Sequence, residues 1–225
     1  MKSSKKLLAG SLVLLTLWVP SSAATAPADA GSRTPAQYRP AAGPGSIPMF
    51  FEQNVGQTDE RVRFVGRGRD YSVLVTDSEA VFKLVPSGPD ERGADVRMTW
   101  VGADASARVV AAAPLPGKSN YMLGNDPAAW KTDIPTFGKV KHEEVYPGVD
   151  LEFYGKGGLL EYDVVVKPGG DPDNVRLRFT GAERISIDEV SGDLVLNVEG
   201  GEIRHQKARV YQPTSAGRRL VGARY

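Results

Sequence analysis

From about residue 50 onward, apolar and polar residues alternate with a period of two, and no segment keeps the 3.6-residue period of a helix. Segments 96–101 and 194–198 show this alternation most clearly. The pattern predicts strands at 61–66, 71–76, 80–85, 96–101, 107–112, 136–141, 151–154, 159–166, 174–180, 185–187, 194–198, 206–212 and 219–225. About a dozen short strands with little helix favour an all-β fold, an antiparallel β-sandwich.

Turn sequences separate these strands. Residues 146–149 read Tyr-Pro-Gly-Val and predict a type II turn, because proline presets φ and glycine accepts the positive φ that follows. Residues 127–130, which begin with a proline, predict one short helical turn ending at Trp130. Residues 199–202 predict a tight hairpin around Gly200 and Gly201.

The N-terminus has a different pattern. Lysines precede an apolar run at 7–19, and small residues follow it, so residues 1–23 are interpreted as a secretory signal peptide cleaved after Ala23 or Ala24. The run is shorter than the roughly 20 residues that span a bilayer, so we expect no membrane span after cleavage. Residues 24–48 are rich in Pro, Ala and Gly and predict a disordered linker. The folded domain is then 49–225, and the protein is secreted or lies at the cell surface.

Composition excludes some partners and bonds. The chain of 225 residues has a net charge of +1, which gives no reason to expect a nucleic-acid partner. It contains no cysteine, so it forms no disulfide and carries no lipid on a cysteine. The two histidines are far apart in sequence, which makes a zinc site improbable.

The stretch from Leu115 to Gly155 carries a family resemblance. In order, the chain reads LPGKSNYMLGNDPAAWKTDIPTFGKV, then VYPGVDLEFYG, then LEYDVVVKPGGDP, and an earlier segment reads FEQN followed by GQ. This order resembles the uncharacterised N-terminal domain that precedes SBBP (seven-bladed β-propeller) repeats in large secreted or surface proteins of bacteria. The resemblance covers about residues 50–225. It implies no catalytic or binding residues, and the repeats themselves are absent from this sequence.

Four acidic residues form the candidate site. A two-residue turn at 156–157 would place Glu152 opposite Glu161 and Asp150 opposite Asp163. Period-two alternation then puts all four carboxylates on one face of the hairpin. Like charges that face each other are destabilising, so we expect compensation.

Three interpretations of this cluster stay open. Arg176 and Arg178 on the next predicted strand could form a salt-bridge ladder with the acids, which is the simplest interpretation. Calcium could bind, because it takes about six to eight oxygen ligands and four carboxylates would supply its core. Glycoside hydrolysis needs two carboxylates about 5 to 10 Å apart, which cross-strand acids can provide.

The remaining candidates have simpler interpretations. His142 precedes two glutamates near a turn and is interpreted as a surface residue. His205 is expected opposite Leu196 as a partly buried structural residue. Trp100 and Trp130 could supply a sugar-stacking platform, although aromatic residues on strands are more often core.

We therefore expect a non-catalytic module with a structural or interaction role at the bacterial cell surface. The alternatives are a carbohydrate-binding or carbohydrate-active sandwich and a calcium-stabilised adhesion module, with a surface glycan or a protein as the partner. No other cofactor is expected. The last predicted strand runs to Tyr225, so a truncated domain, or a fragment of a longer repeat protein, is a further expectation.

Overall fold

The computed structural model describes residues 49–68, 71–85, 93–199, 201–214 and 217–222, and the backbone of 11–18. Its strands are β1 (Ser11–Trp18), β2 (Phe51–Gln53), β3 (Phe64–Arg67), β4 (Tyr71–Val75), β5 (Glu79–Leu84), β6 (Asp95–Trp100), β7 (Arg108–Tyr121), β8 (Lys131–Tyr146), β9 (Val149–Lys156), β10 (Leu159–Val166), β11 (Leu177–Thr180), β12 (Arg184–Ile187), β13 (Leu194–Val198), β14 (Gly201–His205), β15 (Arg209–Thr214) and β16 (Gly217–Val221). Within these ranges the helical elements are two single 3-10 turns, η1 (Pro127–Ala129) and η2 (Pro172–Asn174). The prediction of an all-β fold is confirmed.

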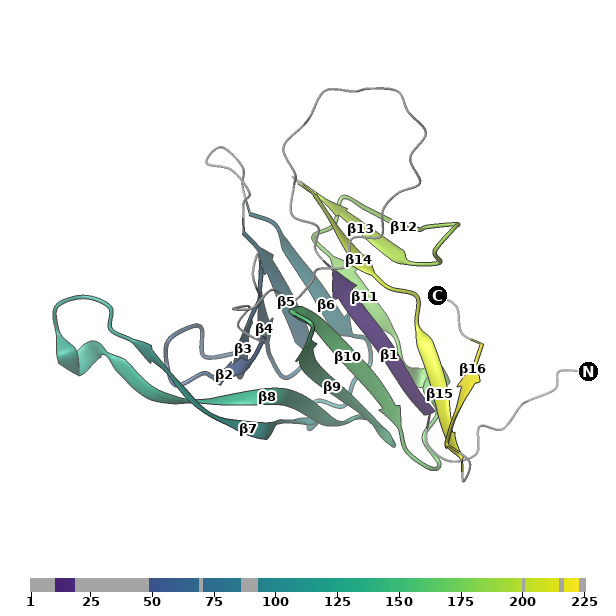
Figure 1. The fold of residues 1–225 in the computed structure, drawn as a ribbon, viewed down its shortest axis with the longest axis horizontal. Helices are drawn as coiled ribbons and strands as arrows, with labels where there is room; N and C mark the ends of the chain where they lie inside the picture. The colour runs from purple at the N-terminus through teal and green to yellow at the C-terminus, as the bar shows by residue number, and fades with distance from the viewer. Residues whose placement is uncertain are drawn as a thin grey trace, which may run out of the picture.

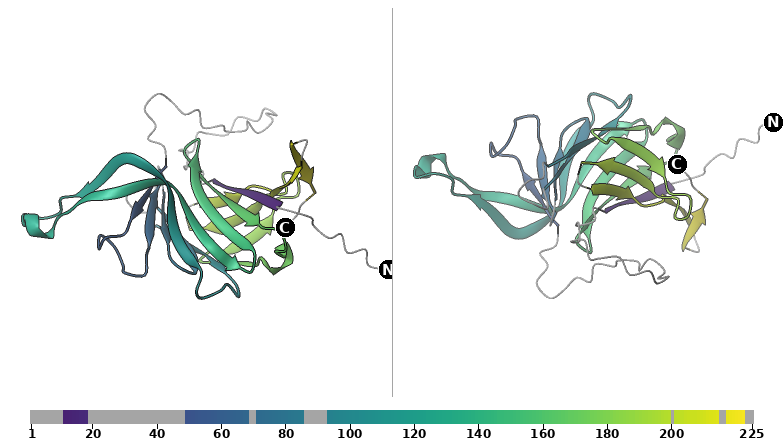
Figure 2. Two further views of the ribbon diagram at one scale, coloured as in Figure 1. Left: turned by 90° about the horizontal axis from the view of Figure 1, so that it is seen from below. Right: turned by 90° about the horizontal axis from the view of Figure 1, so that it is seen from above.

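The strand pairs of the described residues are antiparallel, in the order β11-β6-β5-β4-β3-β2-β8-β9-β10-β1-β14-β13-β12 (Figure 1). Outside this order, β7 pairs with β8, β15 pairs with β1, and β16 pairs with β15. The sheet does not lie flat but curls strongly, as Figure 2 shows from two further directions. Because of this curl, strands that are far apart in the strand order contact each other across the inside of the sheet. The Tyr71 hydroxyl on β4 accepts the backbone N–H of Leu160 on β10 at 2.9 Å.

One hydrophobic core fills the space inside the curl. Alternation places every second residue of β4 and β6 inside. On β9 and β10 the apolar residues of the inward face are buried in the same way, but Asp150, Glu161 and Asp163 on the other face are buried too. Trp100 on β6 stacks at a tilt on Phe153 of β9, with ring centroids 5.8 Å apart. The fully buried Tyr162 and Leu196 extend this core towards β14. The apolar positions of these alternating segments therefore form the core.

The largest departure from the predicted strands is the hairpin of β7 and β8. The sequence predicted short strands at 107–112 and 136–141, whereas β7 has 14 residues and β8 has 16. Ala113, Asp133 and Glu144 adopt positive φ values of 55° to 57°, and the pairing shifts register near each of them. These irregularities break the simple alternation, so the pattern under-predicted the strands.

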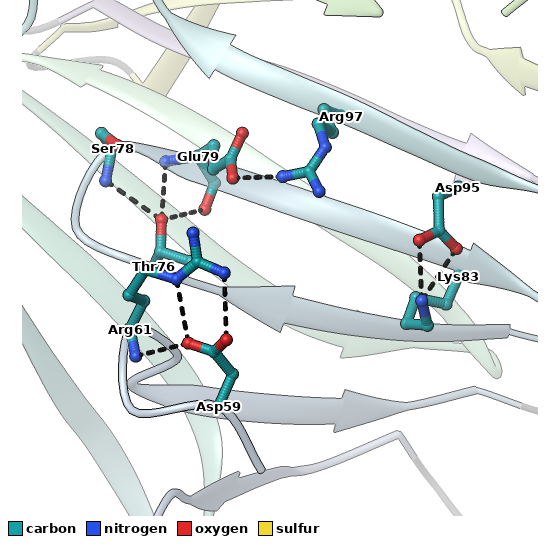
Figure 3. A network of polar contacts seen from close by, with 8 residues as sticks. All are labelled: Asp59, Arg61, Thr76, Ser78, Glu79, Lys83, Asp95 and Arg97. Atoms are coloured by element: carbon teal, nitrogen blue, oxygen red, sulfur yellow. Dashed lines mark hydrogen bonds and ion pairs between the residues drawn. The ribbon is translucent and has the colours of Figure 1, made fainter. Parts of the chain in front are cut away.

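Hydrogen-bonded side chains fasten the outer surface of β4, β5 and β6 (Figure 3). Thr76 Oγ1 accepts the backbone N–H groups of Ser78 and Glu79 and donates to the Glu79 carbonyl, which closes the β4–β5 turn. Exposed pairs follow on the strands, with Arg97 2.6 Å from Glu79 and Lys83 2.7 Å from Asp95. Such exposed pairs contribute little to stability, about 0 to 1 kcal/mol each.

The N-terminal predictions fall mostly outside the described residues. This holds for residues 1–10 and 19–48, which include the cleavage site and the predicted linker. The part that is described, 11–18 within the apolar run, is strand β1 of the sheet, which the sequence did not predict. No helix in the described part of the chain is both long and apolar enough to cross a membrane.

Candidate functional site

The four acidic residues lie on one face of the β9–β10 hairpin, but in a different register from the predicted one. Asp163 pairs with Glu152, while Glu161 pairs with Tyr154 and Asp150 with Val165. The turn residues are Gly157 and Gly158, at φ 60° and 82°, because a tight hairpin of this kind needs two residues at positive φ. The true turn is one residue later than predicted, which moves the pairing by two residues and leaves the side chains on the same face.

Lysines compensate the acids on the β9 side. Lys139 and Lys141 on the neighbouring strand β8 lie 2.5 Å from Glu152 and 2.8 Å from Asp150. Lys167, just after β10, lies 2.9 Å from Asp150. A backbone N–H also donates to Asp150, and these bonds hold its pKa below the usual range despite its burial.

On the β10 side the compensation is weaker. Lys156 lies 3.4 Å from Glu161 and is itself largely exposed. Asp163 accepts a hydrogen bond from the Tyr154 hydroxyl at 3.0 Å, and the salt bridges of the described residues do not include it. Burial raises the pKa of Asp163 above its ordinary value. The acidic residues on β9 are therefore well paired with lysines, whereas those on β10 have fewer cationic partners.

The prediction that Arg176 and Arg178 lie beside the acidic residues is wrong. Strand β11 pairs with β6 and not with β10, so Arg178 lies beside Thr99. Arg176 precedes β11, and its backbone carbonyl accepts a hydrogen bond from the Tyr146 hydroxyl at 3.1 Å. The reason is the segment around η2, which carries the chain from β10 to β11 at the far end of the strand order. Sequence adjacency therefore did not give spatial adjacency.

The calcium and glycosidase interpretations gain no direct support from this geometry. Within the described residues, no group of three or more His, Cys, Asp or Glu side chains is placed to hold a metal ion. Asp150 and Glu152 are already in salt bridges with lysines. Such a salt-bridged face corresponds to the simplest of the three interpretations, with lysines in place of the arginines.

Both histidines lie in the core. His142 was expected at the surface but is fully buried, because β8 continues past Lys141 and keeps residue 142 on the inward face with Val140. Its Nε2 lies 2.7 Å from the Thr76 carbonyl, and burial lowers its pKa to about 4. Its Nδ1 is buried without a hydrogen-bond partner among the described residues.

His205 is buried as expected, although it pairs with Leu194 and not with Leu196. The cause is again a turn misplaced by one residue, since Val198 pairs with Gly201. The Tyr162 hydroxyl lies 3.1 Å from His205 Nε2, and burial lowers the pKa of His205 to about 3. Neither histidine lies where it could exchange protons with a substrate in solvent.

The tryptophans do not form a joint platform. Trp100 packs edge-on against His142 in the core, with centroids 5.2 Å apart, so it cannot stack on a sugar. Trp130 is half-buried at the far end of the β7–β8 hairpin, where its Nε1 donates to the Gly124 carbonyl at 3.2 Å. The predicted short turn at 127–130 is present as η1 and precedes it directly.

A hollow of about 370 Å³ lies beside the loop after β2, lined by Gln53, Asn54, Gly56, Thr58, Glu60, Val62, Arg63, Phe64 and Val109. No pattern in the sequence predicts this hollow. Two of its polar side chains are bonded within the protein: Asn54 Nδ2 donates to the carbonyls of Asp59 and Val62 at 2.8 Å, and Arg63 pairs with Asp77 at 2.8 Å. The bonds of Asn54 therefore hold the loop that forms one wall of the hollow.

The most distinctive surface feature is the arm, which we define as residues 118–135 of the β7–β8 hairpin. Figures 1 and 2 show it projecting from the sheet. Its tip, residues 122–130, exposes Met122 by 60% and Leu123 by 75%. Exposed apolar side chains close together at the end of a projecting element are typical of contact surfaces.

A buried carboxylate fixes the arm to the body of the sheet. Glu52 on β2 is 3% exposed and accepts hydrogen bonds from Ser119 Oγ, at 2.8 Å, and from the Tyr121 hydroxyl. Arg67 on β3 lies 3.5 Å from the same carboxylate and donates to Tyr121. This clamp of Glu52, Arg67, Ser119 and Tyr121 holds the base of the arm in one orientation. Only pairing across the sheet reveals it, because residues 52 and 119 are far apart in sequence.

Comparisons with known proteins give one match. Residues 51–225 match a family model described as a domain of unknown function, DUF7948. No curated protein matches the chain, and no solved structure matches it. Nothing in these comparisons links the chain to proteins with SBBP repeats.

Proposed function

On the premise that this chain belongs to the DUF7948 family, we propose that it is a secreted, non-catalytic module with an interaction role at the bacterial cell surface. The observation that carries the proposal is the clamped arm. A hairpin that projects from the sheet, is oriented by a buried carboxylate and ends in exposed apolar side chains suits contact with another protein. The sequence resemblance to a domain that precedes propeller repeats motivates a place at the N-terminal side of a longer surface protein.

The non-catalytic part of the proposal is supported by the state of the candidate groups. Both histidines are buried in the core, and Asp150, Glu152 and Glu161 are in ion pairs. A general acid or base must reach the proton that it transfers, and a buried, bonded group does so poorly. Export is supported by the lysines, apolar run and small residues of the first 23 positions.

Single cysteines test export and contact together, because the chain has no cysteine of its own. Leu123→Cys places a thiol at the tip, and Val190→Cys is the matched control, since Val190 is 97% exposed on a turn away from the arm. Intact cells of the organism that carries the gene are treated with a membrane-impermeant maleimide, and the labelling rates are compared with those of the purified proteins.

The expected result is labelling of the control cysteine from outside at the rate of the purified protein, with the tip cysteine labelled at least about fivefold more slowly in cells than after purification. Labelling of neither cysteine until the cells are lysed contradicts surface exposure. Equal rates for the tip in cells and in solution contradict contact through the arm.

A further inference from the structure

Strand β1 occupies an internal position of the sheet. Residues Ser11–Leu17 pair antiparallel with Leu160–Val166 of β10. On its other side β1 pairs antiparallel with β14 and with β15. Figures 1 and 2 show it between these strands. In the strand order, β1 is the link between β10 and the group of β12, β13 and β14.

The same residues are the apolar centre of the proposed signal peptide. Cleavage after Ala23 or Ala24 would remove β1, and the family match begins only at residue 51, so the shared domain is defined without this strand. Removal leaves the backbone of 160–166 unpaired along one edge, and the edges of β14 and β15 opposite it. Unpaired edges within a sheet bind other strands readily.

Side-chain packing beneath β1 keeps these two edges apart. The Tyr162 hydroxyl on β10 lies 3.1 Å from His205 Nε2 on β14, across the position of β1. His205 also packs edge-on against Phe179 of β11, with centroids 5.4 Å apart. Closing the gap would move β10 and β14 together by about one strand spacing, roughly 4.8 Å, and disrupt these contacts. The two strands would also have to pair in parallel, since both are antiparallel to β1.

We propose that the gap between β10 and β14 is a strand-acceptor site, which in the processed protein binds an extended segment of a different polypeptide, and not of a second copy of this chain, antiparallel to β10. This inference rests on the proposed export and removal of the signal peptide. Strand addition of this kind gives affinity through main-chain hydrogen bonds and specificity through alternate side chains. The apolar segment 11–18 shows the length and direction of the strand that fits.

The side chains of β10 define what the partner strand must carry. Leu160, Tyr162 and Val164 are buried on the core face, so residues paired with them should be apolar. Glu161 and Asp163 lie on the opposite face, where no ion pair of Asp163 is found among the described residues. A partner with apolar residues at every second position and a basic residue opposite Asp163 matches both faces. In β1 the position opposite Asp163 is Leu14.

Synthetic peptides test the proposal on the exported, processed chain, whose N-terminus is established by mass spectrometry. The reference peptide has the sequence of residues 11–18 with a soluble tail, and binding is measured by titration calorimetry. Leu14→Lys in the peptide should tighten binding about fivefold, and Asp163→Asn in the protein should remove that gain. Leu15→Asp in the peptide should abolish binding, because its pairing partner Tyr162 is fully buried.

A disulfide tests the register. A peptide with Val13→Cys should cross-link to the processed protein carrying Val164→Cys, its pairing partner, and not to the control Val165→Cys, which pairs with position 12. Antiparallel partners lie at Cα separations that a disulfide can bridge, about 4.5 to 5.5 Å. Failure of the in-phase peptide to bind or cross-link overturns the proposal, as does a processed chain whose gap is filled by a second copy in a dimer.

The unprocessed chain separates the two hypotheses. Val13→Cys with Val164→Cys in a chain that retains residues 1–23 should form an internal disulfide, whether or not the chain is exported. A disulfide in this chain, together with no cleavage in cells, would contradict export and leave the strand position itself correct. Cleavage in cells without peptide binding would contradict the acceptor site alone.

Discussion

The two buried histidines predict that the protein loses stability in mild acid. Burial lowers the pKa of His142 to about 4 and that of His205 to about 3, so both rings are neutral in the folded state. In the unfolded chain they titrate at about pH 6.5. Because the folded pKa values are lowered, the unfolded state binds more protons, and the stability present above pH 6.5 is lost as the pH falls towards the folded pKa values.

The size of the loss follows from these values. Between pH 7 and pH 5, one histidine with a folded pKa of about 4 lowers the free energy of unfolding by about 2 kcal/mol, and two lower it by about 4 kcal/mol. This is a large part of the roughly 5 to 15 kcal/mol that is typical of a folded domain. Carboxylates with lowered pKa values, such as Asp188 at about 2, lose their contribution only at more acidic pH. Asp163, whose pKa is raised by burial, binds protons more readily in the folded state and offsets part of the loss, so the histidine contribution is taken from the difference between the parent and a histidine variant.

Urea unfolding followed by tryptophan fluorescence at pH 7, 6 and 5 measures this loss. His142→Gln removes one titrating ring and keeps an amide that can donate to the Thr76 carbonyl. It should lower stability at pH 7 through poorer packing but halve the loss between pH 7 and pH 5, from about 4 to about 2 kcal/mol. Val73→Ala is the control, because it lowers stability in the core without changing the pH dependence. If His142→Gln keeps the full pH dependence of the parent, the reasoning is refuted.

Two further changes test the turns and the clamp. Gly148→Ala should lower the free energy of unfolding by about 2 to 3 kcal/mol, because residue 148 has φ 71° and an added Cβ would lie 2.8 Å from Gly170 Cα. Gly157→Ala is the control: residue 157 has φ 60° but open space around it, so the loss should be about 1 kcal/mol. Equal losses for the two variants in urea unfolding would contradict the close approach of residues 148 and 170. Glu52→Ala should lower the free energy of unfolding by about 2 to 3 kcal/mol and speed amide exchange in the arm. Glu52→Gln should cause a smaller loss of stability than Glu52→Ala. Glu79→Gln, which breaks an exposed ion pair, is the control and should stay within about 0.5 kcal/mol of the parent. Unchanged amide exchange in the arm of Glu52→Ala would show that the clamp does not orient it.

The sequence predicted the fold class and the shared face of the acids because both depend on period-two alternation, which survives small errors in turn position. It misplaced the turns after Lys156 and Val198 by one residue each, since two adjacent glycines leave the position of the turn open. It failed for Arg178 and His142 for a different reason. Packing between distant segments decides which strand lies beside β10 and how far β8 extends. The local pattern of apolar and polar residues does not contain this information.

The pairing of β6 with β11 has a consequence for how the chain folds during synthesis. The edge of β6 stays open until Thr180 is available to pair with Arg97, and β2 waits in the same way for Thr136 beside Glu52. Contacts between such distant segments slow folding, because the entropy of closing a long loop is lost before the stabilising contacts form. These two pairings are therefore expected to form later than the hairpins of consecutive strands, such as β3 with β4 and β9 with β10, which can close as soon as each is synthesised.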